Sequence, residues 1–146
     1  MFELLMWIAS PPLVAPLGCS EDAIHAIKDP SVVRHGGAWH LFWSIRGTKR
    51  SHRIEYLTFP DWDQAGKFSR RILTLSPGYF CASQVFYFTS HQKWYLIYQV
   101  GEESRTTSLQ PAWSATEDLA DPDSWSKPVL LFERHPANVK MWIDFG

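Results

Sequence analysis

Three polar residues stand at similar intervals along the 146-residue chain: Asp29, Gln84 and Asp144. Each lies beside a run of apolar and aromatic residues that is typical of a strand. Glycoside hydrolysis needs two carboxyl groups flanking a sugar bond, one to activate water and one to protonate the leaving oxygen, and neighbouring charges tune both. We therefore take Asp29 and Asp144 as candidate catalytic residues, although an Asp before a Pro is also common in turns.

An internal repeat suggests how these side chains are brought together. Aligning Trp39 with Trp94 brings two aromatic strands into register at an offset of 55, and the same offset carries Asp29 onto Gln84. Pro30 restricts Asp29 to extended conformations. Two copies of an inner strand, a turn and an aromatic strand fit neighbouring blades of a β-propeller, in which the inner strands line the axis. Two ordinary hairpins of a β-sandwich would give a similar pattern.

The rest of the chain also predicts an all-β fold. Short apolar and aromatic segments alternate with clusters of Gly, Pro, Asp and Ser, which is typical of antiparallel strands. Residues 79–88 and 93–100 are expected to form a hairpin across 89–92, and 62–68 a helical turn. At this repeat length the chain would hold about two to three of the ~4–8 blades that a propeller needs. The other expected strands are residues 38–45, 53–59, 71–75, 113–116 and 129–132.

Composition excludes several classes of protein. The formal net charge is −1, so neither a nucleic-acid binder nor a polybasic membrane anchor is indicated. No apolar stretch reaches the ~20 residues of a membrane span. The apolar start carries Glu3 and no early Lys or Arg, so it is a poor signal peptide. Aromatic residues make up 15% of the chain, which suits a core as well as a sugar-binding surface.

Cysteine and histidine give no metal motif. There is no Cys-x-x-Cys or His-x-x-x-His spacing, so a zinc site of the usual kind is not supported. The two cysteines, Cys19 and Cys81, are expected to be unpaired thiols more readily than a disulfide.

Six motifs together resemble glycoside hydrolase family 62. They follow the family's order and approximate spacing, and the likeness runs from about Trp7 to the last residue. The match is specific as a set, although each motif alone would be weak. The motifs are AIKDPSVV at 26–33, GAWH at 37–40, TFPDWDQA at 58–65, SQVFYF at 83–88, KWYLIYQ at 93–99 and WIDF at 142–145.

The resemblance implies a five-bladed β-propeller of which residues 1–146 are an incomplete catalytic domain. It implies α-L-arabinofuranosidase activity that releases terminal side groups from arabinoxylan with inversion. Asp29 would then be the general base and Asp144 the residue that modulates the general acid. The acid itself is a Glu on a later blade that no residue here matches, so this chain alone should be inactive.

The resemblance also assigns substrate-binding residues. Lys28 would donate to sugar hydroxyls beside the base, and the Gln84 amide would donate and accept with the furanose. Trp94 would be a platform for the xylan chain, with a core role equally plausible, and Trp142 would wall the sugar pocket. No metal or cofactor is required, although an ion on the propeller axis is left open.

Departures from the family and a rival class remain. The family has Pro where this chain has Ser83. The family is normally secreted, so the resemblance implies an extracellular location. We also expect a monomer. The rival is a non-catalytic carbohydrate-binding β module that uses its aromatic strands as platforms.

Overall fold

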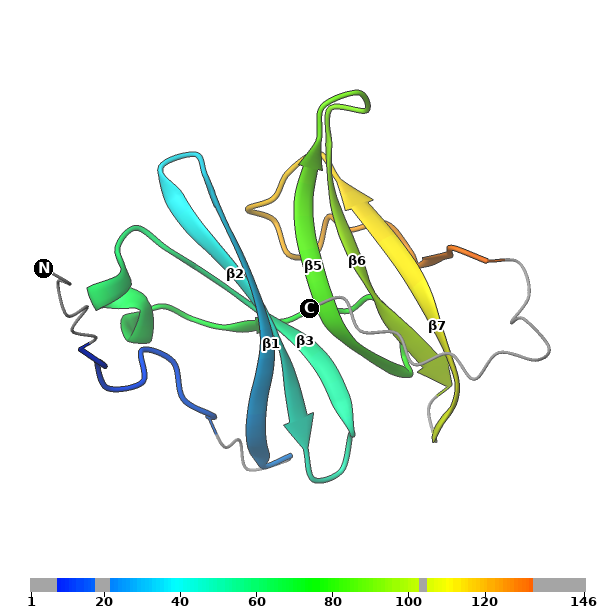
Figure 1. Ribbon diagram of the computed structural model, residues 1–146, viewed down its shortest axis with the longest axis horizontal. Helices are drawn as coiled ribbons and strands as arrows, with labels where there is room; N and C mark the ends of the chain where they lie inside the picture. The colour runs from blue at the N-terminus through cyan, green and yellow to red at the C-terminus, as the bar shows by residue number, and fades with distance from the viewer. Residues whose placement is uncertain (1–7, 18–21, 103–104, 133–146) are drawn as a thin grey trace, which may run out of the picture.

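Two four-stranded antiparallel sheets make up the fold (Figure 1). The computed structural model describes residues 8–17, 22–102 and 105–132. Each sheet has its strands in chain order, β1-β2-β3-β4 and β5-β6-β7-β8. The strands are β1 (Ile24–His35), β2 (Ala38–Gly47), β3 (His52–Phe59), β4 (Arg71–Ile72), β5 (Tyr79–Phe88), β6 (Lys93–Glu102), β7 (Arg105–Thr116) and β8 (Val129–Leu130).

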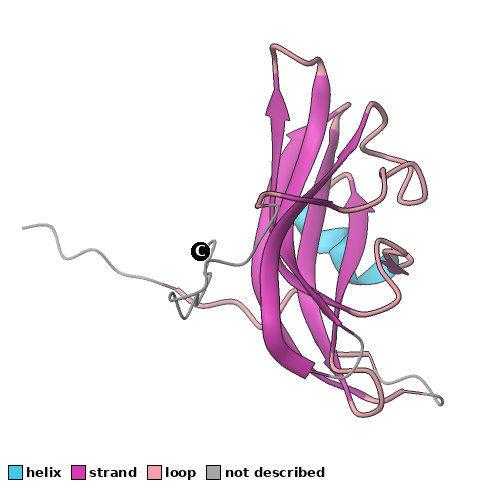
Figure 2. Cartoon of the chain, turned by 90° about the vertical axis from the view of Figure 1, so that its right-hand side faces the viewer, coloured by secondary structure: helices cyan, strands magenta, loops and turns pink. Residues whose placement is uncertain are grey.

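The all-β prediction is confirmed, and most expected strands lie within a few residues of the observed ones. The hairpin of β5 and β6 is as expected, and the helical turn is the 3₁₀-helix η1 (Trp62–Lys67). Figure 2 shows η1 on one flank of the strands. β4 is shorter than expected and β7 begins earlier. None of the described helices is long and apolar enough to cross a membrane.

The repeat is real, but its offset changes from strand to strand. Trp39 and Trp94 are both the second residue of their strands, β2 and β6, which confirms the offset of 55. On the inner strands, however, Ser31 pairs with Phe42 as Gln84 pairs with Ile97. Gln84 is therefore the counterpart of Ser31, and the predicted match of Asp29 with Gln84 is wrong. The cause is the hairpin loop, which has two residues after β1 and four after β5.

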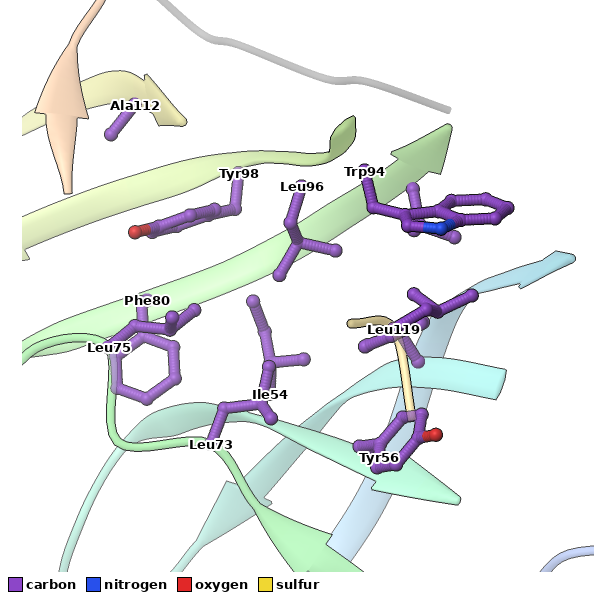
Figure 3. Packing of buried hydrophobic residues seen from close by; sticks show 12 residues of the cluster. Ile54, Tyr56, Leu73, Leu75, Phe80, Trp94, Leu96, Tyr98, Ala112 and Leu119 are labelled. Carbon is purple, nitrogen blue, oxygen red and sulfur yellow. The ribbon is translucent and has the colours of Figure 1, made fainter. Parts of the chain in front are cut away.

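A hydrophobic core lies between the two sheets. Alternate residues of each strand point to opposite faces, so every second side chain of a strand can enter this core. Trp94, Leu96 and Tyr98 of β6 and Tyr56 of β3 belong to this core (Figure 3). Phe42 of β2 belongs to the same cluster. β5 packs across β1, β2 and β3 and is the strand of the second sheet that joins the two layers.

The other face of the first sheet carries a second cluster. Leu41, Trp43 and Ile45 of β2 pack there against Ala65 of η1, with Val14 from the N-terminal segment at its edge. The first sheet is thus packed on both faces.

Candidate active site

Asp29 lies at a β-bulge in the inner strand β1. The pairing of β1 with β2 shifts between Lys28 and Ser31, so Asp29 and Pro30 leave the ladder. Asp29 has φ 53°, in the left-handed region, so the prediction that Pro30 holds it extended is wrong. The bulge overrides the local preference, and Pro30, which has no N–H, fits a position without a ladder bond. Such backbone outliers gather at functional sites.

The Asp29 carboxylate is accessible and incompletely paired. Its side chain is 36% exposed, yet Oδ2 is buried and accepts no hydrogen bond. The nearest cation is Lys28, whose Nζ lies 3.4 Å from that oxygen and whose side chain is 53% exposed. Because the carboxylate as a whole is partly exposed, it can accept a proton from a bound molecule, as a general base must.

Three side chains that the sequence analysis did not select lie within electrostatic range of Asp29. The Cys81 thiol donates to the Tyr79 hydroxyl at 3.0 Å, and the Tyr79 ring lies 4.8 Å from the His52 ring. Burial raises the pKa values of Cys81 and Tyr79, and the Asp29 charge adds to both shifts. Burial lowers the pKa of His52, with Lys28 acting in the same direction. Cys81 is a free, buried thiol whose raised pKa makes it a poor nucleophile.

Two serine hydroxyls fix β5 against the first sheet beside this site. Ser31 Oγ accepts the backbone N–H of Val85 at 2.9 Å, and Ser44 Oγ accepts that of Ala82 at 2.8 Å. Both serines are buried. Ala82 has φ 53°, like Asp29, and lies in the corresponding bulge of β5. The two inner strands therefore carry the same bulge, with a carboxylate on one and a methyl group on the other.

Arg50 holds the segment that leads into β5. Its Nη2 donates to the carbonyls of Ser76, Pro77 and Gly78 at 2.8, 2.7 and 3.1 Å. The loop that carries Arg50 is held in turn by Asp22, which accepts the backbone N–H groups of Lys49 and Arg50. The Lys49 hydrogen bond is the main cause that lowers the pKa of Asp22.

Asp22 also pairs with Arg53 Nη2 at 2.8 Å. The Arg50 and Asp22 contacts join residues 26 to 31 positions apart, so no local sequence motif predicts them. They bring Tyr79 and Cys81 to the Asp29 bulge.

The other predicted site residues have different settings. Gln84 of β5 is exposed and pairs across the ladder with Ile97 of β6. Both residues lie on the face of the second sheet that is turned away from the first sheet. Trp94 is 7% exposed and packs in the core between the sheets against His35 and Tyr87. This burial favours the core role that the sequence left open for Trp94. Trp142 and Asp144 lie outside the described residues.

Another carboxylate, that of Glu55, is buried in the packing of the first sheet. Glu55 on β3 is buried, burial raises its pKa, and Arg70 Nη1 lies 3.7 Å away. The Arg70 guanidinium also covers the Trp43 ring. Because cation and ring close over it, Glu55 has no open side for a substrate. In the described part of the chain, no three His, Cys, Asp or Glu residues gather as a metal site.

Comparison with known proteins gives a consistent likeness. No family model matches the chain. An α-L-arabinofuranosidase C of Cellvibrio japonicus is 32% identical over 133 residues, which cover 90% of this chain and 19% of that protein. The catalytic domain of the Coprinopsis cinerea family 62 α-L-arabinofuranosidase is 38% identical with a TM-score of 0.75, over 87% of this chain and 38% of that one.

A third similar protein is a family 62 hydrolase crystallised with xylotriose, 33% identical with a TM-score of 0.71, over 83% of this chain and 35% of that one. Over most of its length the chain thus resembles glycoside hydrolase family 62, as the motifs predicted. It spans about a fifth of the curated relative and little more than a third of the solved domains.

Proposed function

We propose that this chain is part of an inverting α-L-arabinofuranosidase that removes arabinofuranosyl side groups from arabinoxylan, with Asp29 as its general base. The observation that carries the proposal is the Asp29 bulge, which presents a partly exposed carboxylate beside Lys28, inside a motif on which the family resemblance rests. The solved relatives that share 33 to 38% identity support the substrate class, one of them through its bound xylotriose.

In this proposal Asp29 takes a proton from a water molecule as the water oxygen attacks the anomeric carbon. A Glu from outside this chain gives its proton to the leaving xylose oxygen, so the glycosidic bond breaks with inversion. Asp144 repels negative charge on that Glu, which keeps the acid protonated, and helps to orient it. The chain by itself should release no arabinose.

Binding residues follow from the same resemblance. Lys28 beside Asp29 would donate to sugar hydroxyls, Gln84 would hold the furanose with its amide, and Trp142 would line the pocket. We also propose that the two sheets are two blades of a five-bladed propeller, and that the enzyme is secreted and acts as a monomer.

The test uses a hybrid enzyme in which this chain replaces the matched part of the Coprinopsis cinerea domain. Asp29→Asn removes the charge and keeps a side chain that tolerates positive φ. We expect kcat for arabinose release to fall by about 10³-fold, within the range of general acid–base contributions. Asp63→Asn, at an exposed residue of η1, is the matched control and should leave kcat unchanged.

Near-normal turnover by the Asp29→Asn hybrid would remove Asp29 from the mechanism. Turnover by the 146-residue chain alone would show that the acid lies within it. A chain that binds arabinoxylan oligosaccharides while its hybrid is inactive would favour the carbohydrate-binding module.

A further inference from the structure

Basic side chains gather on the first sheet beside Asp29. Arg46 of β2 lies directly across the ladder from His52 of β3, and two residues before Arg46, Ser44 pairs with Lys28 of β1. Directly paired residues, and residues two apart on one strand, point to the same face of a sheet. Ser44 bonds to β5, so this face is the one turned toward the second sheet. Arg46, Lys28 and His52 therefore lie on that face, beyond the last residues of its hydrophobic core.

The start of β5 lies against this group. The Tyr79 ring of β5 is 4.8 Å from the His52 ring. Burial raises the pKa of Tyr79 and lowers that of His52, and the charges of Arg46 and Asp29 act on both groups. Arg46 and the Asp29 carboxylate therefore border the same region of the surface.

The formal charges of this region do not cancel. Lys28 and Arg46 are both exposed. Lys28 Nζ lies 3.4 Å from Asp29 Oδ2, whereas no acidic group in the described part of the chain forms an ion pair with Arg46. Asp22, the other acid on this side, already pairs with Arg53. Two cations against one carboxylate leave a surplus of a single positive charge beside the proposed general base.

This surplus fits a ligand that carries one carboxylate. The planar guanidinium of an Arg can bind a carboxylate through two parallel hydrogen bonds. A monoanion would cancel the surplus, whereas a phosphate or a nucleic acid would add negative charge close to Asp29, which must itself be ionised to act as a base. Neutral sugar hydroxyls would leave the positive charge of Arg46 uncompensated. Among sugars, the class that carries one carboxylate is the uronic acids.

We infer that Arg46, with Lys28 at its side, binds the carboxylate of a uronic acid carried by the xylan chain from which the arabinofuranosyl group is removed. The inference rests on the proposed function for the identity of that chain, and it makes Arg46 a residue that determines specificity. Since Arg46 and Lys28 are exposed, the interaction should weaken as salt is added.

The test is calorimetric titration of the 146-residue chain with xylo-oligosaccharides that carry a glucuronosyl group. The comparison ligand is the same oligosaccharide after chemical reduction of the carboxyl group to an alcohol, which removes the charge and keeps the sugar. We expect the acidic form to bind about tenfold more tightly. Arg46→Gln should bring the ratio of the two Kd values close to one. Lys67→Gln, at an exposed cation of η1, is the matched control and should keep the full ratio.

A second variant tests the geometry of the contact. Arg46→Lys keeps the charge and loses the planar fork, so it should keep only part of the preference for the acidic form. Circular dichroism melts check folding, and both Arg46 variants should melt like the unsubstituted chain because the Arg46 side chain is exposed. Equal Kd values for the two ligands, absence of binding of the acidic one, or a full preference in folded Arg46→Gln would overturn the inference.

Kinetics of the hybrid enzyme separate this inference from the proposed function. On arabinose-substituted xylan that also carries uronic acid, kcat/KM should be higher before carboxyl reduction than after it, and the difference should lie in KM. An inactive hybrid combined with a preserved preference in the titrations would reject the proposed activity and keep the uronic acid site. An active hybrid with the same kcat/KM on both substrates would overturn the inference alone.

Discussion

The two sheets have the same arrangement of inner strand, bulge and aromatic second strand, but they differ in the residue at the bulge and in the packing of their faces. Both begin with an inner strand that bulges at a residue of φ 53°, and both continue into an aromatic second strand. In the first sheet the bulge holds Asp29 and both faces are packed. In the second the bulge holds Ala82, and Tyr95, Ile97 and Trp113 on its outer face, which is turned away from the first sheet, are only half-buried. The bulge therefore belongs to the architecture, and the carboxylate is what the first sheet adds.

The difference between the faces of the second sheet gives the largest stability effect. Leu96 is fully buried between the sheets, whereas its neighbour Ile97 lies on the outer face. Leu96→Ala should lower the free energy of unfolding by about 2–5 kcal/mol. Ile97→Ala should cost about 1 kcal/mol or less in the chain alone, since little apolar area leaves a packed site. Urea unfolding of both variants measures this, and equal losses would mean that the faces are equally packed.

The next largest effect is expected at the segment that connects the two sheets, which Arg50 holds. Arg50 Nη2 donates to three successive carbonyls before β5. Arg50→Ala should lower the free energy of unfolding by about 2 kcal/mol, because hydrogen bonds to charged groups contribute about 1.5–3 kcal/mol. Arg50→Lys should recover part of this. If both variants unfolded like the unsubstituted chain in urea, Arg50 would have no role in holding the connection.

Acid should weaken the packing between the sheets through His40. Its Nδ1 lies 2.7 Å from the Tyr56 hydroxyl and its Nε2 lies 3.2 Å from the His35 carbonyl. Burial is the main cause that lowers the pKa of His40 below 6.5, and the hydrogen bond to the His35 carbonyl opposes this, as the Asp118 charge does to a smaller extent. Burial raises the pKa of Tyr56 to about 12.

Because His40 has the lower pKa in the folded state, the unfolded chain binds the proton more tightly. Stability should fall as the pH drops below 6.5 and level off below the folded pKa. Urea midpoints at pH 7.5 and about 5.5 should differ less for His40→Gln than for the unsubstituted chain. Burial also lowers the pKa of His52, so stability should still depend on pH to some extent in the His40→Gln variant. If the urea midpoint changed with pH as much in His40→Gln as in the unsubstituted chain, His40 would not contribute to the pH dependence.

The smallest expected effect comes from the bulge of the second sheet. Ala82 is in the left-handed region, where an L-residue other than glycine is strained by about 1–2 kcal/mol. Ala82→Gly removes this strain but also gives the unfolded chain more freedom, which offsets part of the gain, so we expect a net stabilisation of about 0.5–1 kcal/mol. A lower thermal midpoint for the variant would show that the buried methyl group contributes more than the strain costs.

The sequence predicted the strands well because each follows from local alternation and turn residues. Residues 79–88 and the hairpin that follows needed nothing beyond their own pattern. The inner-strand register was missed because a bulge has no sequence signature and the second hairpin loop is two residues longer. The Arg50 contacts and the neighbours of Asp29 were missed because they join distant segments. The proposed chemistry came from the family resemblance, whereas the structure supplied the geometry of Asp29 alone.

The most direct test of the account compares arabinose release from arabinoxylan by the hybrid enzyme and by its Asp29→Asn variant, with the fold of each checked by circular dichroism. The account predicts that the Asp29→Asn hybrid keeps its melting temperature and loses about 10³-fold in kcat. A folded Asp29→Asn hybrid that works at the rate of its parent would contradict it.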